Sequence, residues 1–200
     1  VQRSGRRLEG AEPLARKHQL KLAVENHKDW RTGEFLELLR HIESEWVGVN
    51  FDFGNNFALL EHPDTVAKAL DSYIMTTHIK DMGLAHYDDG FLLSEVPLGK
   101  GVLDLRKLMD TCEEKSPDVQ FNLEMITRDP LKIPVLTKPY FSTLGNVPAS
   151  DLSAILKLAQ SGDPGALPTV TGKPEEEQIT FEAQNVIESF RFARQRLNLA

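Results

Sequence analysis

The sequence predicts an α/β fold in which short buried parallel strands alternate with helices, the pattern of a (β/α)₈ barrel. Short runs that are apolar on both faces, rich in β-branched and aromatic residues, alternate with segments of helical periodicity. Four of these runs, at residues 22–25, 46–52, 73–78 and 119–124, also end in an acidic or imidazole side chain. This is expected where parallel strands bring their carboxyl ends to one mouth of a barrel.

Helices are predicted between the strands. The segment 32–44 carries apolar residues at helical spacing, and Thr32 is expected to cap its start. The segment 63–72 begins with Pro63, which suits the first turn of a helix. Further helices are expected at 5–18, where Pro13 marks a kink or a new start, and at 103–115.

The long connection after the third strand contains the turn sequence Asp88-Asp89-Gly90, and residues 91–96 are expected to form a short extra strand. Beyond the fourth strand the pattern changes. A proline-rich irregular arm at 127–148 precedes a helix at 151–160 capped by Ser150, a linker at 161–174 and a long helix at 175–199. We therefore expect a partial barrel domain at 1–148 and a helical extension at 149–200, which packs on the barrel or on a partner subunit.

Four βα units are too few to close a barrel, which needs eight units and about 250 residues. The chain has 200 residues, begins with Val1 and opens within a helical pattern. We therefore interpret it as the C-terminal half of a barrel, with three or four units expected before Val1. Because the substrate contacts of those units would be absent, one expectation is that this chain is inactive on its own.

The composition and charge of the chain argue against some classes of partner. A net charge of −7 argues against nucleic acid, which needs a basic face. No run approaches the roughly 18 apolar residues of a membrane span. The single cysteine, Cys112, lies in a predicted helix and suits packing in a reducing compartment. A cytoplasmic protein is expected, with a lost N-terminal targeting segment and homo-oligomerisation left open.

The strand ends carry Glu25, Asp52, His78 and Glu124. Three carboxylates and an imidazole at one mouth would repel each other strongly unless a cation lay among them. Each also has a structural alternative: Asp52 could cap the turn after its strand, and His78 could be a rim histidine. Together they favour Mn²⁺, Mg²⁺ or Co²⁺ over Zn²⁺. Such an ion could acidify a C–H next to a substrate carbonyl, and a carboxylate of the site could move the proton.

Five strings, in order along the chain, carry a family resemblance: KLAVENHKDW, VGVNFDFGN, HIKD, VPLGKG and FNLEM. They resemble the xylose-isomerase-like TIM-barrel superfamily, which includes sugar (phosphate) isomerases and epimerases. The resemblance implies that Glu25, Asp52, His78 and Glu124 bind the metal. It also implies that Glu25 and Glu124 act as acid and base on opposite faces of the sugar.

The chain departs from the ketose epimerases of that superfamily at two positions. Asn55 stands where they have a histidine and Leu84 where they have an arginine. Asn55 is a candidate substrate contact, as are Asn26 and His27 beside Glu25.

Lys80, in the HxKD string, is expected to neutralise an enediolate or bind an anionic group, or else to form an ion pair with Asp81 or a neighbouring strand. Gly99-Lys100-Gly101 resembles a phosphate-binding turn, although a lone GxG more often marks a tight turn before a helix.

We therefore expect a divalent-metal-dependent sugar (phosphate) isomerase or epimerase that moves a proton next to a carbonyl through an enediolate. One alternative is a lyase of the same superfamily, of the inosose or dehydroshikimate dehydratase type. Another is a non-catalytic sugar-binding barrel. In each case the expected partner is a small sugar or cyclitol.

Overall fold

The structure is a computed structural model that describes residues 2–199. It forms two compact units. The first holds the chain up to Ile79 together with Lys107–Asn122, and the second holds Lys80–Arg106 and the chain from Leu123 onward. The predicted boundary at residue 148 between a barrel domain and a helical extension stays a prediction.

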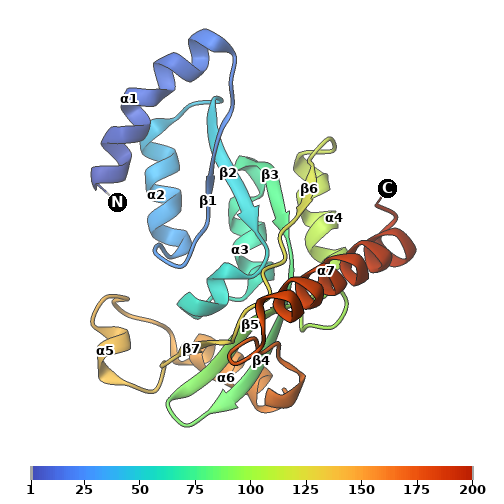
Figure 1. The fold of residues 1–200 in the computed structure, drawn as a ribbon. Helices are drawn as coiled ribbons and strands as arrows, with labels where there is room; N and C mark the ends of the chain where they lie inside the picture. The colour runs from blue at the N-terminus through green and yellow to red at the C-terminus, as the bar shows by residue number, and fades with distance from the viewer. Residues whose placement is uncertain (1, 200) are drawn as a thin grey trace. The chain divides into compact units, whose positions relative to one another are not determined.

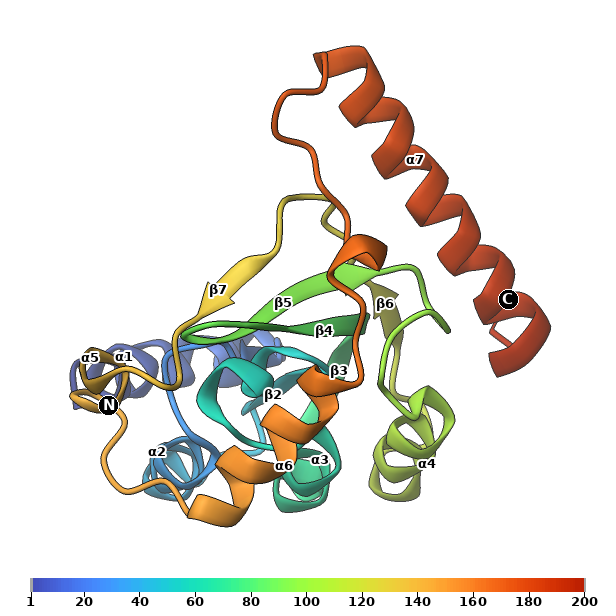
Figure 2. The same ribbon diagram turned by 90° about the horizontal axis from the view of Figure 1, so that it is seen from below.

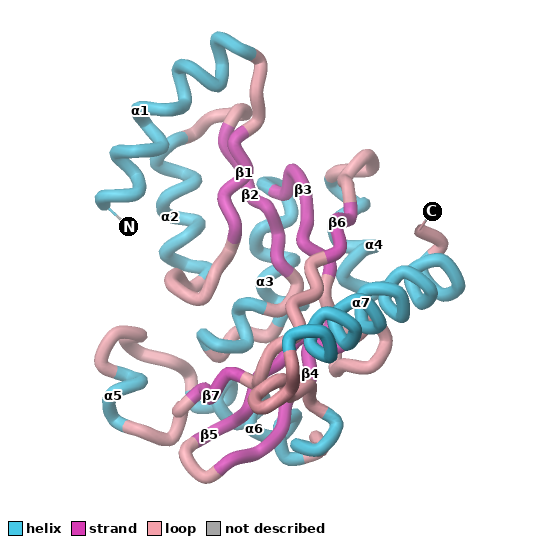
Figure 3. Tube along the Cα trace, in the orientation of Figure 1, coloured by secondary structure: helices cyan, strands magenta, loops and turns pink. Residues whose placement is uncertain are grey.

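The first unit is built on a four-stranded sheet in the order β1-β2-β3-β6 (Figures 1 and 3). The strands are β1 (Leu22–Glu25), β2 (Val47–Asp52), β3 (Ile74–Ile79) and β6 (Phe121–Leu123). β1 pairs with β2 and β2 with β3 in parallel. In this register Glu25 lies opposite Asn50, and Asp52 lies opposite His78. All four strands lie within the predicted apolar runs except that β3 extends one residue further.

Helices cover one face of this sheet. The helices are α1 (Gln2–His18), α2 (Thr32–Ile42), α3 (Pro63–Leu70) and α4 (Leu105–Lys115), with 3₁₀ turns η1 (Asn55–Leu59) and η2 (Asp71–Tyr73). Figure 2 shows α2, α3 and α4 along the same side of the strands. α2 buries Phe35, Leu38 and Leu39, which recur at helical spacing. The alternation of parallel strand and covering helix is that of a (β/α) barrel, as predicted.

The second unit contains a smaller antiparallel sheet in the order β4-β5-β7. Its strands are β4 (Asp81–Tyr87), β5 (Gly90–Val96) and β7 (Leu131–Ile133). α6 (Ala149–Gln160) packs against β4 and β5. The unit also holds α5 (Lys138–Phe141), η3 (Pro164–Ala166), α7 (Glu175–Phe192) and a final π-helical turn, η4 (Ala193–Leu197).

The extra strand predicted at 91–96 is confirmed as β5, although its partners β4 and β7 were not predicted. Two cap predictions were wrong. The N-cap of α2 is Arg31 and that of α6 is Pro148, so neither Thr32 nor Ser150 is a cap. Thr32 instead donates its hydroxyl to Glu61 at 3.0 Å. Among the described residues, no helix is long and apolar enough to cross a bilayer.

Candidate metal centre

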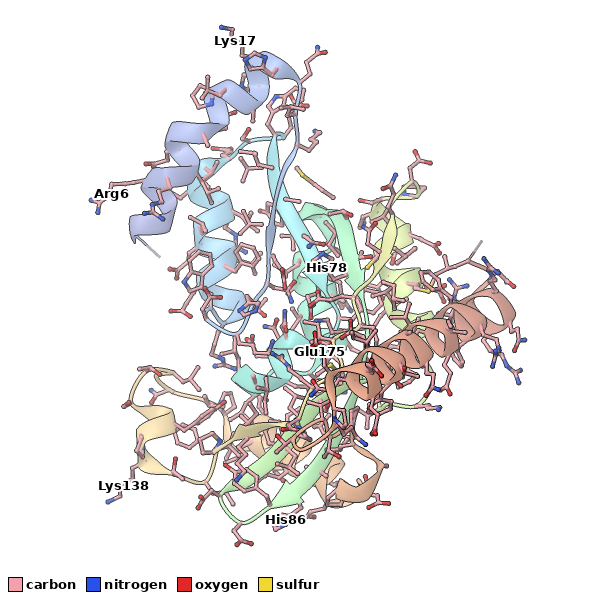
Figure 4. The ribbon with its side chains drawn as sticks, in the orientation of Figure 1. Arg6, Lys17, His78, His86, Lys138 and Glu175 are labelled. Carbon is pink, nitrogen blue, oxygen red and sulfur yellow. The ribbon has the colours of Figure 1, made fainter. Side chains whose placement is uncertain are left out.

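Glu25, Asp52 and His78 meet at the carboxyl ends of three adjacent strands of the first unit. Each offers one ligand atom, and these atoms lie within 4.8 Å of one another. Nδ1 of His78 is 3.7 Å from Oε2 of Glu25, and Figure 4 labels His78 at the end of β3. The parallel pairing explains this convergence, because it sets Asp52 directly opposite His78 and ends β1 beside β2.

Asp52 is almost fully buried, with 1% of its surface exposed. Its Oδ1 accepts the backbone N–H groups of Gly54 at 2.9 Å and Asn55 at 2.8 Å. The carboxylate therefore caps the turn that opens η1, which is the structural alternative to a metal role. The same carboxyl group also offers a ligand atom to the cluster with Glu25 and His78, so the capping role leaves a metal role open to it.

Two successive side-chain hydrogen bonds hold Glu25 in place. Asn55, which is buried, donates its Nδ2 to Oε1 of Glu25 at 2.8 Å. Lys28 in turn donates to Oδ1 of Asn55. Since a carboxylate ligand must be oriented to meet an ion, Asn55 positions Glu25 whether or not it also touches substrate.

Asn26 ties the ends of β1 and β2 together. Its Oδ1 accepts the backbone N–H of Asp52 at 2.7 Å, and its Nδ2 donates to the Asp52 carbonyl at 2.9 Å and to Asn56 at 2.8 Å. Its amide is thus occupied in holding the strand that carries a candidate ligand. The neighbouring His27 is exposed. Substrate contacts by Asn26, His27 and Asn55 stay predictions.

The donor set fits a hard divalent ion. Ions of this class bind oxygen at about 2.0–2.6 Å, so two ligand atoms on opposite sides of one ion are separated by at most about 5 Å. The 4.8 Å limit on the ligand atoms of Glu25, Asp52 and His78 meets this condition. Two carboxylates and an imidazole suit Mn²⁺, Mg²⁺ or Co²⁺.

Glu124, which directly follows β6, is counted with the second unit. There it lies beside Lys80, whose side chain is 1% exposed. Nζ of Lys80 is 3.0 Å from Oε1 of Glu124 and 3.3 Å from Oε1 of Glu95. The other oxygen of Glu95 accepts the backbone N–H of Ile126 at 2.6 Å. Burial raises the pKa of Glu95, and the charge of Lys80 opposes that rise.

Asp81 does not take the ion-pair role suggested for it. Its buried carboxylate accepts four backbone N–H groups, from Met82, Gly99, Gly101 and Leu103, at 2.8–3.2 Å. Burial raises the pKa of Asp81, and these four hydrogen bonds oppose the rise. A Cβ at Gly101 would overlap the carboxylate. The amides of the glycine turn thus bind an internal carboxylate, which is the tight-turn interpretation of Gly99-Lys100-Gly101 rather than the phosphate-binding one.

Two residues at these sites were missed by the sequence reasoning. Glu95 is the one charged residue in the apolar run of β5, and Asn50 interrupts the apolar residues of β2. A lone polar residue within a buried strand signals a buried partner. The sequence nevertheless could not say that Glu95 meets Lys80 or that Asn50 contacts His78.

The family model that describes a xylose isomerase-like TIM barrel matches residues 1–140. The chain belongs to the xylose isomerase-like TIM barrel family. This family comprises sugar isomerases and epimerases and related lyases, so its members are enzymes that act on small sugar-like substrates.

One relative is the 3-oxo-isoapionate decarboxylase of Pectobacterium atrosepticum, which is 32% identical over 101 residues. The match covers 50% of this chain and 37% of the relative, so the chain spans well under two thirds of that enzyme.

Two solved structures share the fold. A xylose isomerase-like TIM barrel protein from Mycobacterium smegmatis, solved in complex with magnesium, has a TM-score of 0.55 and 20% identity. That match covers 78% of this chain and 49% of the other. The probable 3-DHS dehydratase AsbF from Bacillus anthracis has a TM-score of 0.50 and 18% identity, with 76% and 54% covered.

Proposed function

We propose that this protein is a divalent-metal-dependent enzyme of sugar metabolism and that Glu25, Asp52, His78 and Glu124 hold the ion. The observation that carries this proposal is the convergence of Glu25, Asp52 and His78 within 4.8 Å. Clustered carboxylates of this kind are costly without a cation to offset their repulsion.

Chain connectivity supports Glu124 as the fourth ligand. Asn122, in β6, donates its Nδ2 to Oγ1 of Thr76 at 2.9 Å and to the carbonyl of Thr77 at 3.1 Å. These hydrogen bonds fasten the end of β6 to the residues just before His78. Glu124 follows Asn122 by two positions, and two residues span at most about 7 Å. It is therefore tethered near the strand end that carries His78.

A bound ion would polarise a substrate carbonyl and stabilise the negative charge of an enediolate. The protein's own residues would do the rest. Glu25 and Glu124 are suited to remove and return the proton on carbon. Lys80, buried between Glu95 and Glu124, supplies a fixed positive charge beside Glu124. This charge would attract an anionic substrate group.

The first candidate reaction is isomerisation or epimerisation of a sugar or sugar phosphate, which needs only proton transfer next to a carbonyl. The second candidate is lyase chemistry. It is favoured by the 32% identity to a decarboxylase of a 3-oxo sugar acid. Loss of CO₂ from such an acid leaves an enediolate, and loss of water from a keto-cyclitol passes through an enediolate before the hydroxyl leaves to give an enone. The same ion would stabilise the negative charge in both cases.

The metal site is tested by titrating the full chain with Mn²⁺ and measuring free Mn²⁺ by electron paramagnetic resonance. One Mn²⁺ should bind per chain. His78→Gln and Asp52→Asn should each weaken binding by tenfold or more. His86→Gln is the matched control, since His86 is exposed and lies outside the proposed ligand set. Absence of Mn²⁺ binding to the unaltered chain at millimolar concentration would sink the proposal and favour a non-catalytic barrel.

The reaction class is tested with Mn²⁺-loaded protein in D₂O. An isomerase or epimerase should introduce deuterium at the carbon next to the carbonyl of a ketose. A decarboxylase should release CO₂ from 3-oxo sugar acids, and a dehydratase should give an enone absorbance with keto-cyclitols. Deuterium incorporation without CO₂ or enone selects the first candidate, and either of the other signals selects the lyase.

A further inference from the structure

We propose that Asn50 is a positioning residue that sets the tautomer of His78 for metal binding. In the metal-bound protein, Oδ1 of Asn50 accepts the Nε2–H of His78, and Nδ1 is thereby kept unprotonated toward the ion. This inference rests on the metal site proposed above.

The geometry places Asn50 behind the histidine ring. The side-chain amide of Asn50 lies with Nδ2 3.0 Å from Nε2 of His78. On the other side of the ring, Nδ1 lies 3.7 Å from Oε2 of Glu25. One nitrogen of the imidazole thus faces the candidate ligands, and the other faces the Asn50 amide.

The position of Asn50 in β2 makes this contact a product of the fold. Side chains alternate along a strand, so Asn50 and Asp52 project from the same face of β2. Asn50 pairs with Glu25 on one neighbouring strand and with Thr76 on the other. It is 8% exposed. An amide buried at this point has a defined set of neighbours, and the imidazole of His78 is one of them.

Two hydrogen-bond arrangements satisfy the contact between the amide and the ring. In the first, the amide NH₂ donates to an unprotonated Nε2, and the ring proton is on Nδ1 beside Glu25. In the second, the amide is turned by half a rotation, and its oxygen accepts a proton carried by Nε2. The oxygen and NH₂ of an amide are nearly equal in size, so both arrangements fit the same space.

Metal binding selects the second arrangement. An imidazole binds a metal ion through an unprotonated nitrogen, and Nδ1 is the nitrogen that faces Glu25. The ring proton of the neutral imidazole must then be on Nε2, where only an acceptor can meet it. In the first arrangement Oδ1 of Asn50 is buried and, within the described part of the chain, meets no hydrogen-bond donor. In the second arrangement, this oxygen accepts the Nε2–H of His78.

The test compares Mn²⁺ affinity in four variants of the 200-residue chain. Asn50→Leu removes the acceptor and should weaken Mn²⁺ binding by about 10–100-fold, the usual effect of losing the hydrogen-bond partner of a metal-bound histidine. Asn50→Asp keeps an acceptor and should bind at least as tightly as the unaltered chain. In a His78→Gln background, Asn50→Leu should cause no further loss, because Asn50 acts through His78.

A structural role for Asn50 would not produce this pattern, since it would lower affinity in both backgrounds. A second measurement needs no substitution at Asn50. In the chain loaded with diamagnetic Mg²⁺ and labelled with ¹⁵N-histidine, His78 should show a proton on Nε2 and none on Nδ1, with its signals assigned from the His78→Gln variant.

The outcomes separate this inference from the proposed function. If the unaltered chain binds no Mn²⁺, both fail. If it binds Mn²⁺ but Asn50→Leu leaves the affinity unchanged, or lowers it equally in the His78→Gln background, only the role of Asn50 is overturned. A proton on Nδ1 in the Mg²⁺-loaded chain overturns it as well.

Discussion

Replacing Asp81 with leucine should destabilise the chain by about 3 kcal/mol. Asp81 accepts four backbone N–H groups, from Met82, Gly99, Gly101 and Leu103. At a net value of about 1 kcal/mol per hydrogen bond, these contribute roughly 4 kcal/mol. Leucine recovers part of this, because the raised pKa of Asp81 shows that burying its carboxylate is itself costly.

Asparagine at the same position should cost less. Each carboxylate oxygen accepts two of the four bonds. Asparagine converts one oxygen into a donor, so two bonds are lost and about 2 kcal/mol is expected. We therefore predict that the natural chain is the most stable, that Asp81→Asn is less stable and that Asp81→Leu is the least stable.

The assay is urea unfolding of the full chain followed by circular dichroism, with the slope m compared between variants. Asp88→Asn is the control, since Asp88 is an exposed aspartate and a surface change of this kind is expected to shift stability by about 0.5 kcal/mol or less. A loss of less than about 1 kcal/mol in Asp81→Leu, at unchanged m, would refute the idea that this carboxylate organises the glycine turn.

Three further predictions concern buried groups elsewhere. Lys80→Met should lower the free energy of unfolding by about 3 kcal/mol or more, because it leaves the buried Glu95 without this cation. In urea titrations, adding Glu95→Leu should restore most of the lost stability. Equal losses of stability in the single and double variants would contradict the pairing. The pKa of the Cys112 thiol is raised to about 12 from 9.0, mainly by burial. As the pH rises, the thiol therefore ionises in the unfolded chain before it ionises in the folded chain. The free energy of unfolding should fall between pH 9 and 12 more steeply than in Cys112→Ala, and parallel plots of stability against pH for the two proteins would contradict this prediction. Gly48→Ala should cost about 1–3 kcal/mol in thermal melts, because its Cβ would lie 2.5 Å from the Tyr73 carbonyl oxygen. Gly33→Ala, with open space around the new methyl, should be neutral or stabilising, and similar melting temperatures for both variants would disprove the clash.

The convergence of Glu25, Asp52 and His78 could be predicted from the sequence because the three residues occupy equivalent local positions. Each of Glu25, Asp52 and His78 ends an apolar run, and parallel pairing brings such ends together whatever the loops between them do. The residues that support the ligands follow no such rule. Asn55 was predicted as a substrate contact, which stays a prediction, and its hydrogen bond to Glu25 was not predicted.

The second unit was predicted less well. β4 begins two residues after β3 ends, so no turn sequence separates the two strands. β7 has only three residues and pairs with β5, from which it is separated by α4 and β6. Short strands that pair across such a separation carry little periodicity of their own, and their partners supply the stabilising contacts.

The amino-acid sequence by itself determined the alternation of parallel strands and helices and the three side chains that meet at the strand ends. These depend on local periodicity and on the shared direction of the strands. Only the tertiary structure decided that Asp81 binds the glycine turn, that Glu95 holds Lys80 and that Asn50 contacts His78. Each of these pairs joins residues 15 to 28 positions apart. Buried polar groups take whichever partner the packed chain brings within hydrogen-bond distance, and no local pattern specifies that partner.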